Sequence, residues 1–192
     1  SRQKLNEVLS SSILISISIS IFLFFIISFF LVKPILSFLN IPQELYSVAS
    51  YAFYLLIPFV LIQILLIPFR SYLNVKEDFY TVTISDIIIS LIKLLAAFVI
   101  IYDNSVLVFF KFILVGQILA AIFTLIRFNS VYKNFTFTLN LKLTYSIWNF
   151  SKWIFLGSGL YIIKEQGIGI VINKLFGLTG NASFGVAKQI VN

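Results

Sequence analysis

Ionisable side chains that fall inside long apolar runs are the residues of this sequence best placed to do chemistry. Asp86 and Lys93 are separated by about two helical turns, so a helix places both on one face. A charge near the centre of a bilayer costs a few kcal/mol or more and usually faces a bundle interior or a water-filled cavity. Two interpretations stay open: the pair lines a polar cavity, or a neighbouring helix satisfies each charge.

A second polar group interrupts the apolar stretch from Trp148 to Phe176. Lys164, Glu165 and Gln166 are consecutive there, and on a helix they point about 100° apart. One interpretation is that they contact a polar substrate or a coupling ion in a central cavity. The other is a loop with the apolar stretch ending near Ile163, which would leave a short span.

Other polar residues have simpler expected roles. Arg70 and Arg127 follow apolar runs and are expected to anchor helix ends, while Gln63 and Gln117 are expected to hydrogen-bond between helices. The sequence has no cysteine and no histidine, no phosphate-binding GxxxxGK[ST] loop, and no paired carboxylates at catalytic spacing. These absences predict that the chain is not an enzyme and holds neither a metal nor a cofactor. The net charge of +7 is dispersed between apolar runs, which argues against nucleic acid as a partner.

The elements that must position these groups are transmembrane helices. The chain is 60% hydrophobic and only 11% charged, whereas soluble domains carry about 25% charged residues. A spanning helix needs about 20 apolar residues, and the sequence predicts an all-α, polytopic bundle with about five complete spans and the start of a sixth. The predicted spans are Ile13–Val32 closed by Lys33-Pro34, then 48–69, 79–102, 106–126 and 148–176, with a sixth beginning at Ala182 after a turn at Gly177–Gly180.

Two of the predicted spans leave alternatives open, and two polar segments are predicted to connect spans. The period-two alternation of Ile and Ser from 13 to 21 is also compatible with a strand. The 148–176 stretch is long for one span, so it is either strongly tilted or broken by its glycines. Residues 70–79 and 127–145 are more polar and are predicted to be loops, the second with an interfacial amphipathic piece.

Basic residues give the expected orientation of these spans. Alternating helices would put Arg2, Lys4, Arg70, Lys76, Arg127, Lys133, Lys142 and Lys152 on one side, and Lys33 and Lys174 on the other. Cytoplasmic loops carry the excess of Lys and Arg. The N-terminal segment and the two polar loops are therefore expected in the cytoplasm.

A set of short motifs near the end of the sequence carries a family resemblance. The motifs are Trp153-Ile-Phe-Leu-Gly157-Ser158, Gln166-Gly167, Ile172-Asn173, Phe176-Gly177, Asn181-Ala182, Gly185-Val-Ala187 and Gln189. This pattern resembles the central segment of O-antigen and polysaccharide flippases, which belong to the superfamily of the MATE multidrug exporters and the lipid II flippase. The resemblance implies that the chain covers the third to seventh helices and the start of the eighth, of twelve or more. Residues 1–127 would finish the N-terminal bundle, 128–147 form a cytoplasmic basic loop, and 148–192 begin the C-terminal bundle.

The resemblance also implies a function. Two bundles would rock around a central cavity and carry an undecaprenyl-pyrophosphate-linked oligosaccharide to the outer face of the bacterial inner (cytoplasmic) membrane, during synthesis of an O-antigen-like polysaccharide. A polysaccharide polymerase would then be a partner. The expected substrate-binding residues of the cavity are Lys93, Lys164, Gln166 and Asn173, and the expected ion-coupling residues are Asp86 and Glu165.

Two other functions remain open at this point. A MATE-type antiporter of organic cations would favour carboxylates in its cavity, whereas the deepest groups here include at least as many lysines as acids. A membrane scaffold that transports nothing would leave the charges at membrane depth hard to explain.

Overall fold

The computed structural model describes residues 2–39, 41–103, 105–133 and 135–191, without the side chains of 103, 161–166, 178 and 189–191. Its elements are α1 (Arg2–Phe25), a π-helix η1 (Ile26–Leu31), α2 (Val32–Phe38), a 3-10 turn η2 (Gln43–Leu45), α3 (Tyr46–Val75), α4 (Phe79–Asp103), α5 (Val106–Val131) and α6 (Leu141–Val191). The described residues contain no strand, so the predicted all-α class is confirmed.

Four described segments are long and apolar enough to cross a membrane. They are Arg2–Phe38, Gln43–Val75, Phe79–Tyr102 and Val106–Val131. The chain is therefore a polytopic membrane helical bundle, as predicted. The fifth span and the start of a sixth, both within α6, stay predictions.

The first helix is longer than predicted. The expected end at Lys33-Pro34 is wrong, because α1, η1 and α2 follow one another without a break as far as Phe38. The π-helix ends at Leu31, three positions before Pro34, and the N–H of Val32 donates to the carbonyl of Ile27, five residues back. This wider turn changes which carbonyl faces the proline ring, so the helix tolerates a residue that usually ends it.

The strand alternative for residues 13–21 is also wrong, since α1 covers the whole alternation. A serine inside a helix can bond back to its own backbone, and Ser18 Oγ donates to the carbonyl of Leu14 at 2.9 Å. In lipid, a helix satisfies its own backbone hydrogen bonds, and this requirement outweighs the period-two pattern of Ile and Ser.

The polar segments predicted as loops are mostly helical. Arg70 lies inside α3, which continues to Val75, and Arg127 lies inside α5. The connection from α3 to α4 is only the turn at 76–78, where Glu77 has a φ of 59°. Hydropathy marks the part of a helix that lies in lipid, whereas helical hydrogen bonding continues through polar residues beyond it. For this reason each predicted loop was too long.

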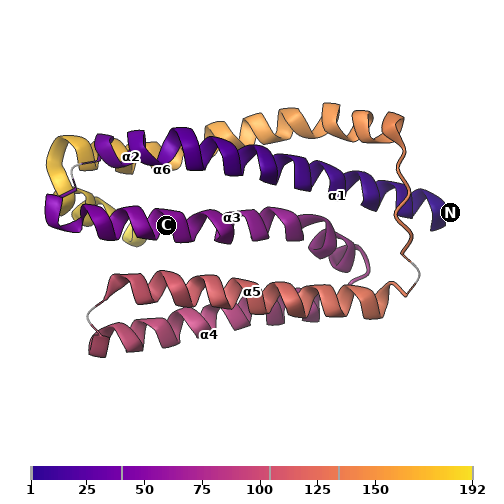
Figure 1. Ribbon diagram of the computed structural model, residues 1–192, viewed down its shortest axis with the longest axis horizontal. Helices are drawn as coiled ribbons and strands as arrows, with labels where there is room; N and C mark the ends of the chain where they lie inside the picture. The colour runs from indigo at the N-terminus through magenta and orange to yellow at the C-terminus, as the bar shows by residue number, and fades with distance from the viewer. Residues whose placement is uncertain (1, 40, 104, 134, 192) are drawn as a thin grey trace.

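The helices lie in layers (Figure 1). Helix α6 lies beside α1 and α2, α3 lies in the middle, and α4 and α5 form the opposite side. The α4–α5 contact is close at Gly116, where an added Cβ would lie 3.2 Å from two carbons of Ile92. Between the same helices the hydroxyls of Ser85 and Thr124 lie 3.0 Å apart. Small and hydroxyl-bearing residues are typical of helix contacts in membranes, because they allow close approach and bond across the interface.

The long helix α6 changes direction at Gly177. This residue has φ 71° and ψ −168°, and α6 contains no other described residue with non-helical dihedrals. The helix therefore runs unbroken from Leu141 to Phe176 through its earlier glycines, and a loop starting near Ile163 is wrong. A Cβ at Gly180 would lie 2.5 Å from Cβ of Phe176, so the predicted turn needs glycine at both positions.

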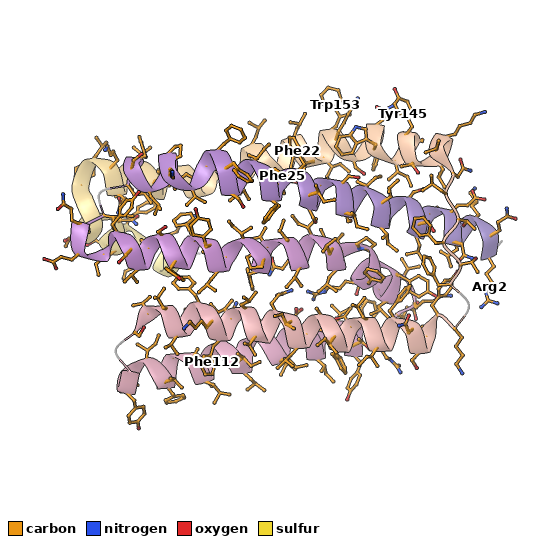
Figure 2. The ribbon with its side chains drawn as sticks, viewed as in Figure 1. Arg2, Phe22, Phe25, Phe112, Tyr145 and Trp153 are labelled. Carbon is orange, nitrogen blue, oxygen red and sulfur yellow. The ribbon has the colours of Figure 1, made fainter. Side chains whose placement is uncertain are left out.

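The surface of the bundle is unusually apolar. Phe22, Phe25 and Trp153 project from it with exposed fractions of 64%, 53% and 68% (Figure 2). A water-soluble chain would bury side chains of this size, whereas lipid solvates them.

Candidate functional site

An ion pair joins α3 to α4 on an exposed part of the bundle. Nη2 of Arg70 lies 2.7 Å from Oδ1 of Asp86, and the two side chains are 31% and 57% exposed. Of the two interpretations for Asp86, the structure shows the second: a neighbouring helix satisfies the charge. Arg70 therefore does more than anchor a helix end, because it binds the acid of the next span.

Asp86 begins a polar stripe on α4, here called the α4 polar stripe, which consists of Asp86, Ser90 and Lys93. Ser90 Oγ donates to the carbonyl of Asp86 at 2.9 Å. Lys93 is exposed and has no hydrogen bond or ion pair with any described residue. The predicted sharing of one face by Asp86 and Lys93 follows from α4 being helical throughout. The stripe thus carries one neutralised charge and one free ammonium.

A second group of polar residues lies next to this stripe, in a groove of about 460 Å³ between α3 and α5. The groove, here called the α3/α5 groove, is lined by Val60, Gln63, Ile64, Leu66, Ile67, Arg70, Ser71, Asn74 and Gln117. Arg70 belongs to both the groove and the ion pair, so the groove and the α4 polar stripe are contiguous through its side chain. A volume of this size is within the range of small-molecule sites.

Gln117 is the least expected member of the groove lining. Its side chain is 1% exposed, and its Oε1 is buried without a hydrogen-bond partner in the described structure. The expected interhelical hydrogen bond for Gln117 is therefore wrong for this oxygen, because a groove separates α3 from α5 where the partner would have to lie. Buried amide oxygens are almost always bonded, so an orphan requires an explanation.

Three polar residues, Gln63 of α3, Lys93 of α4 and Gln117 of α5, lie at similar depth in the bundle. Gln63 is 12 residues from the end of α3, Lys93 is 14 residues from the start of α4, and Gln117 is 14 residues from the end of α5. At 1.5 Å per residue these separations are roughly 18 Å, 21 Å and 21 Å from the same end of the bundle. This depth is near the middle of a hydrocarbon core about 30 Å thick once polar helix ends extend beyond it.

The structure does not bring all the predicted cavity residues together. Asn173 is buried in α6, next to Lys174, whose ammonium lies 5.2 Å from the ring centre of Phe38 at the end of α2. Asn173 is thus on the α1–α2 side of the bundle, whereas Lys93 belongs to α4, which lies on the opposite side (Figure 1). The side chains of Lys164, Glu165 and Gln166 lie outside the described residues. Asp86 and Lys93 share helix α4 and its polar stripe, and their roles in a substrate site stay predictions.

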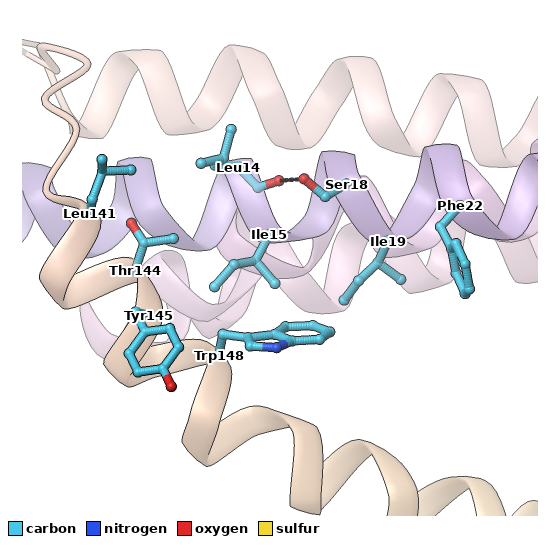
Figure 3. Close-up of a pocket in the computed structure, with 9 residues that line it drawn as sticks. All are labelled: Leu14, Ile15, Ser18, Ile19, Phe22, Leu141, Thr144, Tyr145 and Trp148. Carbon is cyan, nitrogen blue, oxygen red and sulfur yellow. Dashed lines mark hydrogen bonds between the residues drawn. The ribbon is translucent and has the colours of Figure 1, made fainter.

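A cavity of about 720 Å³ lies between α1 and α6 (Figure 3). This α1/α6 groove is lined by Leu14, Ile15, Ser18, Ile19, Phe22, Leu141, Thr144, Tyr145 and Trp148. The lining is almost entirely apolar, and the Ser18 hydroxyl is already bonded to Leu14. Sequence reasoning missed this groove because it depends on which helices pack together, and residue spacing does not encode that pairing.

The segment between α5 and α6 is tied to α1. This segment, here called the strap, comprises residues 132–133 and 135–140 and has no helical turn. Asn6 donates to Thr136 at 2.7 Å and accepts from the hydroxyl of Tyr132. Ser10 accepts from the N–H of Thr138 at 3.0 Å. A polar face of α1 therefore fixes the start of α6 at this end of the bundle, and the amphipathic piece expected within 127–145 stays a prediction.

A capping carboxylate lies at the same end of the bundle. Asp78 directly precedes α4 and accepts from the N–H of Thr81 at 3.3 Å and from Nε of Arg127 at 2.9 Å. Burial acts to raise the pKa of the Asp78 carboxyl, but hydrogen bonding to Thr81 and Arg127 outweighs burial and holds this pKa below its ordinary value. Arg127 thus links the end of α5 to the start of α4.

Four long apolar helices that carry polar groups along their length define a multi-pass membrane protein. The MatE family model matches residues 1–99, and the chain belongs to this family of membrane transporters. No curated protein and no solved structure showed a significant match. The match confirms the superfamily inferred from the motifs, although it covers α1 to α3 and most of α4 and not the segment that carried the motifs.

Proposed function

We propose that this chain is part of a flippase that moves an undecaprenyl-pyrophosphate-linked oligosaccharide from the cytoplasmic to the outer face of the bacterial inner membrane. The observation that carries the proposal is the charge balance at membrane depth. Asp86 is the acid of the α4 polar stripe and is bound to Arg70, while Lys93 has no acidic partner among the described residues. An excess of cationic groups favours an anionic headgroup over an organic cation.

The two grooves support an amphiphilic substrate. The α3/α5 groove presents amide and hydroxyl groups, whereas the α1/α6 groove presents an apolar wall. A lipid-linked sugar has the same division between a polar head and a hydrocarbon tail. The amphiphile therefore fits this pair of surfaces better than a small cation does.

Within this proposal Lys93 attracts the pyrophosphate, and Asp86 takes part in ion coupling through its ion pair with Arg70. Lys164, Gln166 and Asn173 keep their proposed contacts with the substrate, and Glu165 its proposed role in ion coupling. A polysaccharide polymerase that receives the delivered product remains a proposed partner.

The test is transport by the full-length protein in proteoliposomes. Wild type is expected to move a fluorescent undecaprenyl-pyrophosphate-linked oligosaccharide and not tetraphenylphosphonium. Lys93→Met is expected to slow transport at least about tenfold, the effect of losing one charge-assisted contact. Lys111→Met on α5, an exposed lysine, is the matched control and is expected to behave as wild type. Transport of the cation alone, or an active Lys93→Met variant, would overturn the proposal.

A further inference from the structure

We infer that the α3/α5 groove is a binding site for uncharged, hydroxyl-bearing groups, that is, for the sugar rings of a substrate, with Gln117 as a specificity-determining residue. This inference rests on the proposed function for the identity of the substrate. It goes beyond that function by separating the site of the sugar from the site of the pyrophosphate.

The first reason is the orphan amide of Gln117. Its Oε1 has no hydrogen-bond partner in the described structure although the side chain is 1% exposed. An unsatisfied buried acceptor is costly in the empty protein, and the cost is removed when a donor arrives. A hydroxyl group is such a donor. Rotation about the last side-chain bond of Gln117 can present either the amide oxygen or the amide nitrogen to that hydroxyl.

The second reason is the charge of the groove. Among the described residues that line it, Arg70 alone is charged, and Asp86 engages one nitrogen of that guanidinium. The pair is neutral as a unit, so neither a free anion nor a free cation gains a large electrostatic benefit. The lining has no aromatic side chain, so it also lacks the usual means of holding an organic cation.

The third reason is the supply of neutral polar groups. Gln63, Ser71 and Asn74 line the groove from α3 and offer carboxamide and hydroxyl groups opposite Gln117. A guanidinium has five N–H donors, so Arg70 retains donors beyond the one used by Asp86. Both donors and acceptors are therefore present, which is the combination that a ring of hydroxyl groups requires.

The position of the groove explains why it and Lys93 would act on one molecule. Arg70 connects the groove to the α4 polar stripe, and Gln63, Lys93 and Gln117 are at similar depth. A headgroup could place its pyrophosphate at Lys93 and its first sugar in the groove. The structure thus divides recognition into a charged part and a neutral part.

The test is binding of soluble probes to the full-length protein in nanodiscs, followed by saturation-transfer NMR. The probes are neutral monosaccharides and their deoxy analogues, with inorganic pyrophosphate and tetraphenylphosphonium as charged comparators. Wild type is expected to bind a neutral sugar, and Gln117→Leu to weaken that binding about tenfold. Gln43→Leu, the same substitution at an exposed residue before α3, is the matched control and is expected to have no effect.

A second variant protects the test against misfolding. Asn74→Leu changes an exposed residue of the groove and is expected to weaken sugar binding several-fold while the protein remains folded in size-exclusion chromatography. Unchanged sugar affinity in both variants, or binding of only the charged probes, would overturn the inference.

Transport measurements separate the two proposals. If wild type moves the lipid-linked oligosaccharide and Gln117→Leu moves it with unchanged KM, the groove is not the sugar site and the proposed function stands. If wild type moves no lipid-linked sugar but binds a monosaccharide through Gln117, the proposed function fails and the binding site stands.

Discussion

Replacing Gln117 by leucine should stabilise the empty protein, because the wild-type side chain buries an amide oxygen that bonds to nothing described. Removing a buried, unsatisfied polar group recovers about 1–3 kcal/mol, and leucine keeps most of the volume of the side chain. Leucine has one heavy atom fewer than glutamine, and the small void it leaves costs part of that gain. The net expectation is about 1 kcal/mol of added stability.

For a chain of this size, about 1 kcal/mol corresponds to a rise in Tm of about 2–4 °C. The assay is thermal unfolding of the purified protein in one detergent, with wild type, Gln117→Leu and Gln43→Leu compared in parallel. The exposed control should leave Tm unchanged. The prediction is informative because one substitution raises stability and lowers sugar affinity, and misfolding produces no such combination. A fall in Tm by several degrees would show that the Gln117 amide is satisfied, and would refute the reasoning.

Three further predictions concern packing, pH and the strap. Gly116→Val should cost about 2 kcal/mol through overpacking against Ile92, and Ile92→Ala should partly restore Tm in the double variant, since the clash is between these two residues. Because the pKa of Asp78 is lowered in the folded protein, its contribution to stability is present above the ordinary carboxyl pKa and is lost as pH falls through the folded pKa. Asp78→Asn should therefore make Tm less dependent on pH in that acidic range. An unchanged dependence of Tm on pH would contradict this. Asn6→Leu removes two hydrogen bonds to the strap, so amide exchange there should become about tenfold faster by mass spectrometry while α4 remains protected; equal protection of the strap would show that these bonds contribute little.

Helix boundaries show where sequence reasoning succeeds and where it stops. The span predicted for 79–102 agrees with α4 almost to the residue, because a polar turn flanks the apolar run on each side. The first span was cut short at Pro34, since proline usually ends a helix and nothing in the local sequence announces a π-helix. Arg70 was predicted at the start of a loop because it is polar, although helical hydrogen bonding continues through it to Val75.

The candidate site was predicted in part. The period of the helix is sufficient to place Asp86 and Lys93 on one face, and composition is sufficient to put both inside a membrane. The partner of Asp86 could not be predicted, because it comes from another helix and depends on the crossing of α3 with α4. Gln117 was assigned an interhelical bond on frequency alone, and only the packing of α3 on α5 reveals a groove where that bond was expected.

Some properties of this protein follow from the sequence alone, whereas others follow only from the way its helices pack. The sequence by itself determined that the chain is an all-helical, multi-pass membrane protein with polar groups at membrane depth, because segment length and transfer free energy depend on composition alone. Tertiary structure decided that Asp86 is paired, that Lys93 has no partner among the described residues, and that Gln117 lines a polar groove beside Arg70. Those outcomes depend on distances between helices, which packing fixes and which the spacing of residues along one helix does not contain.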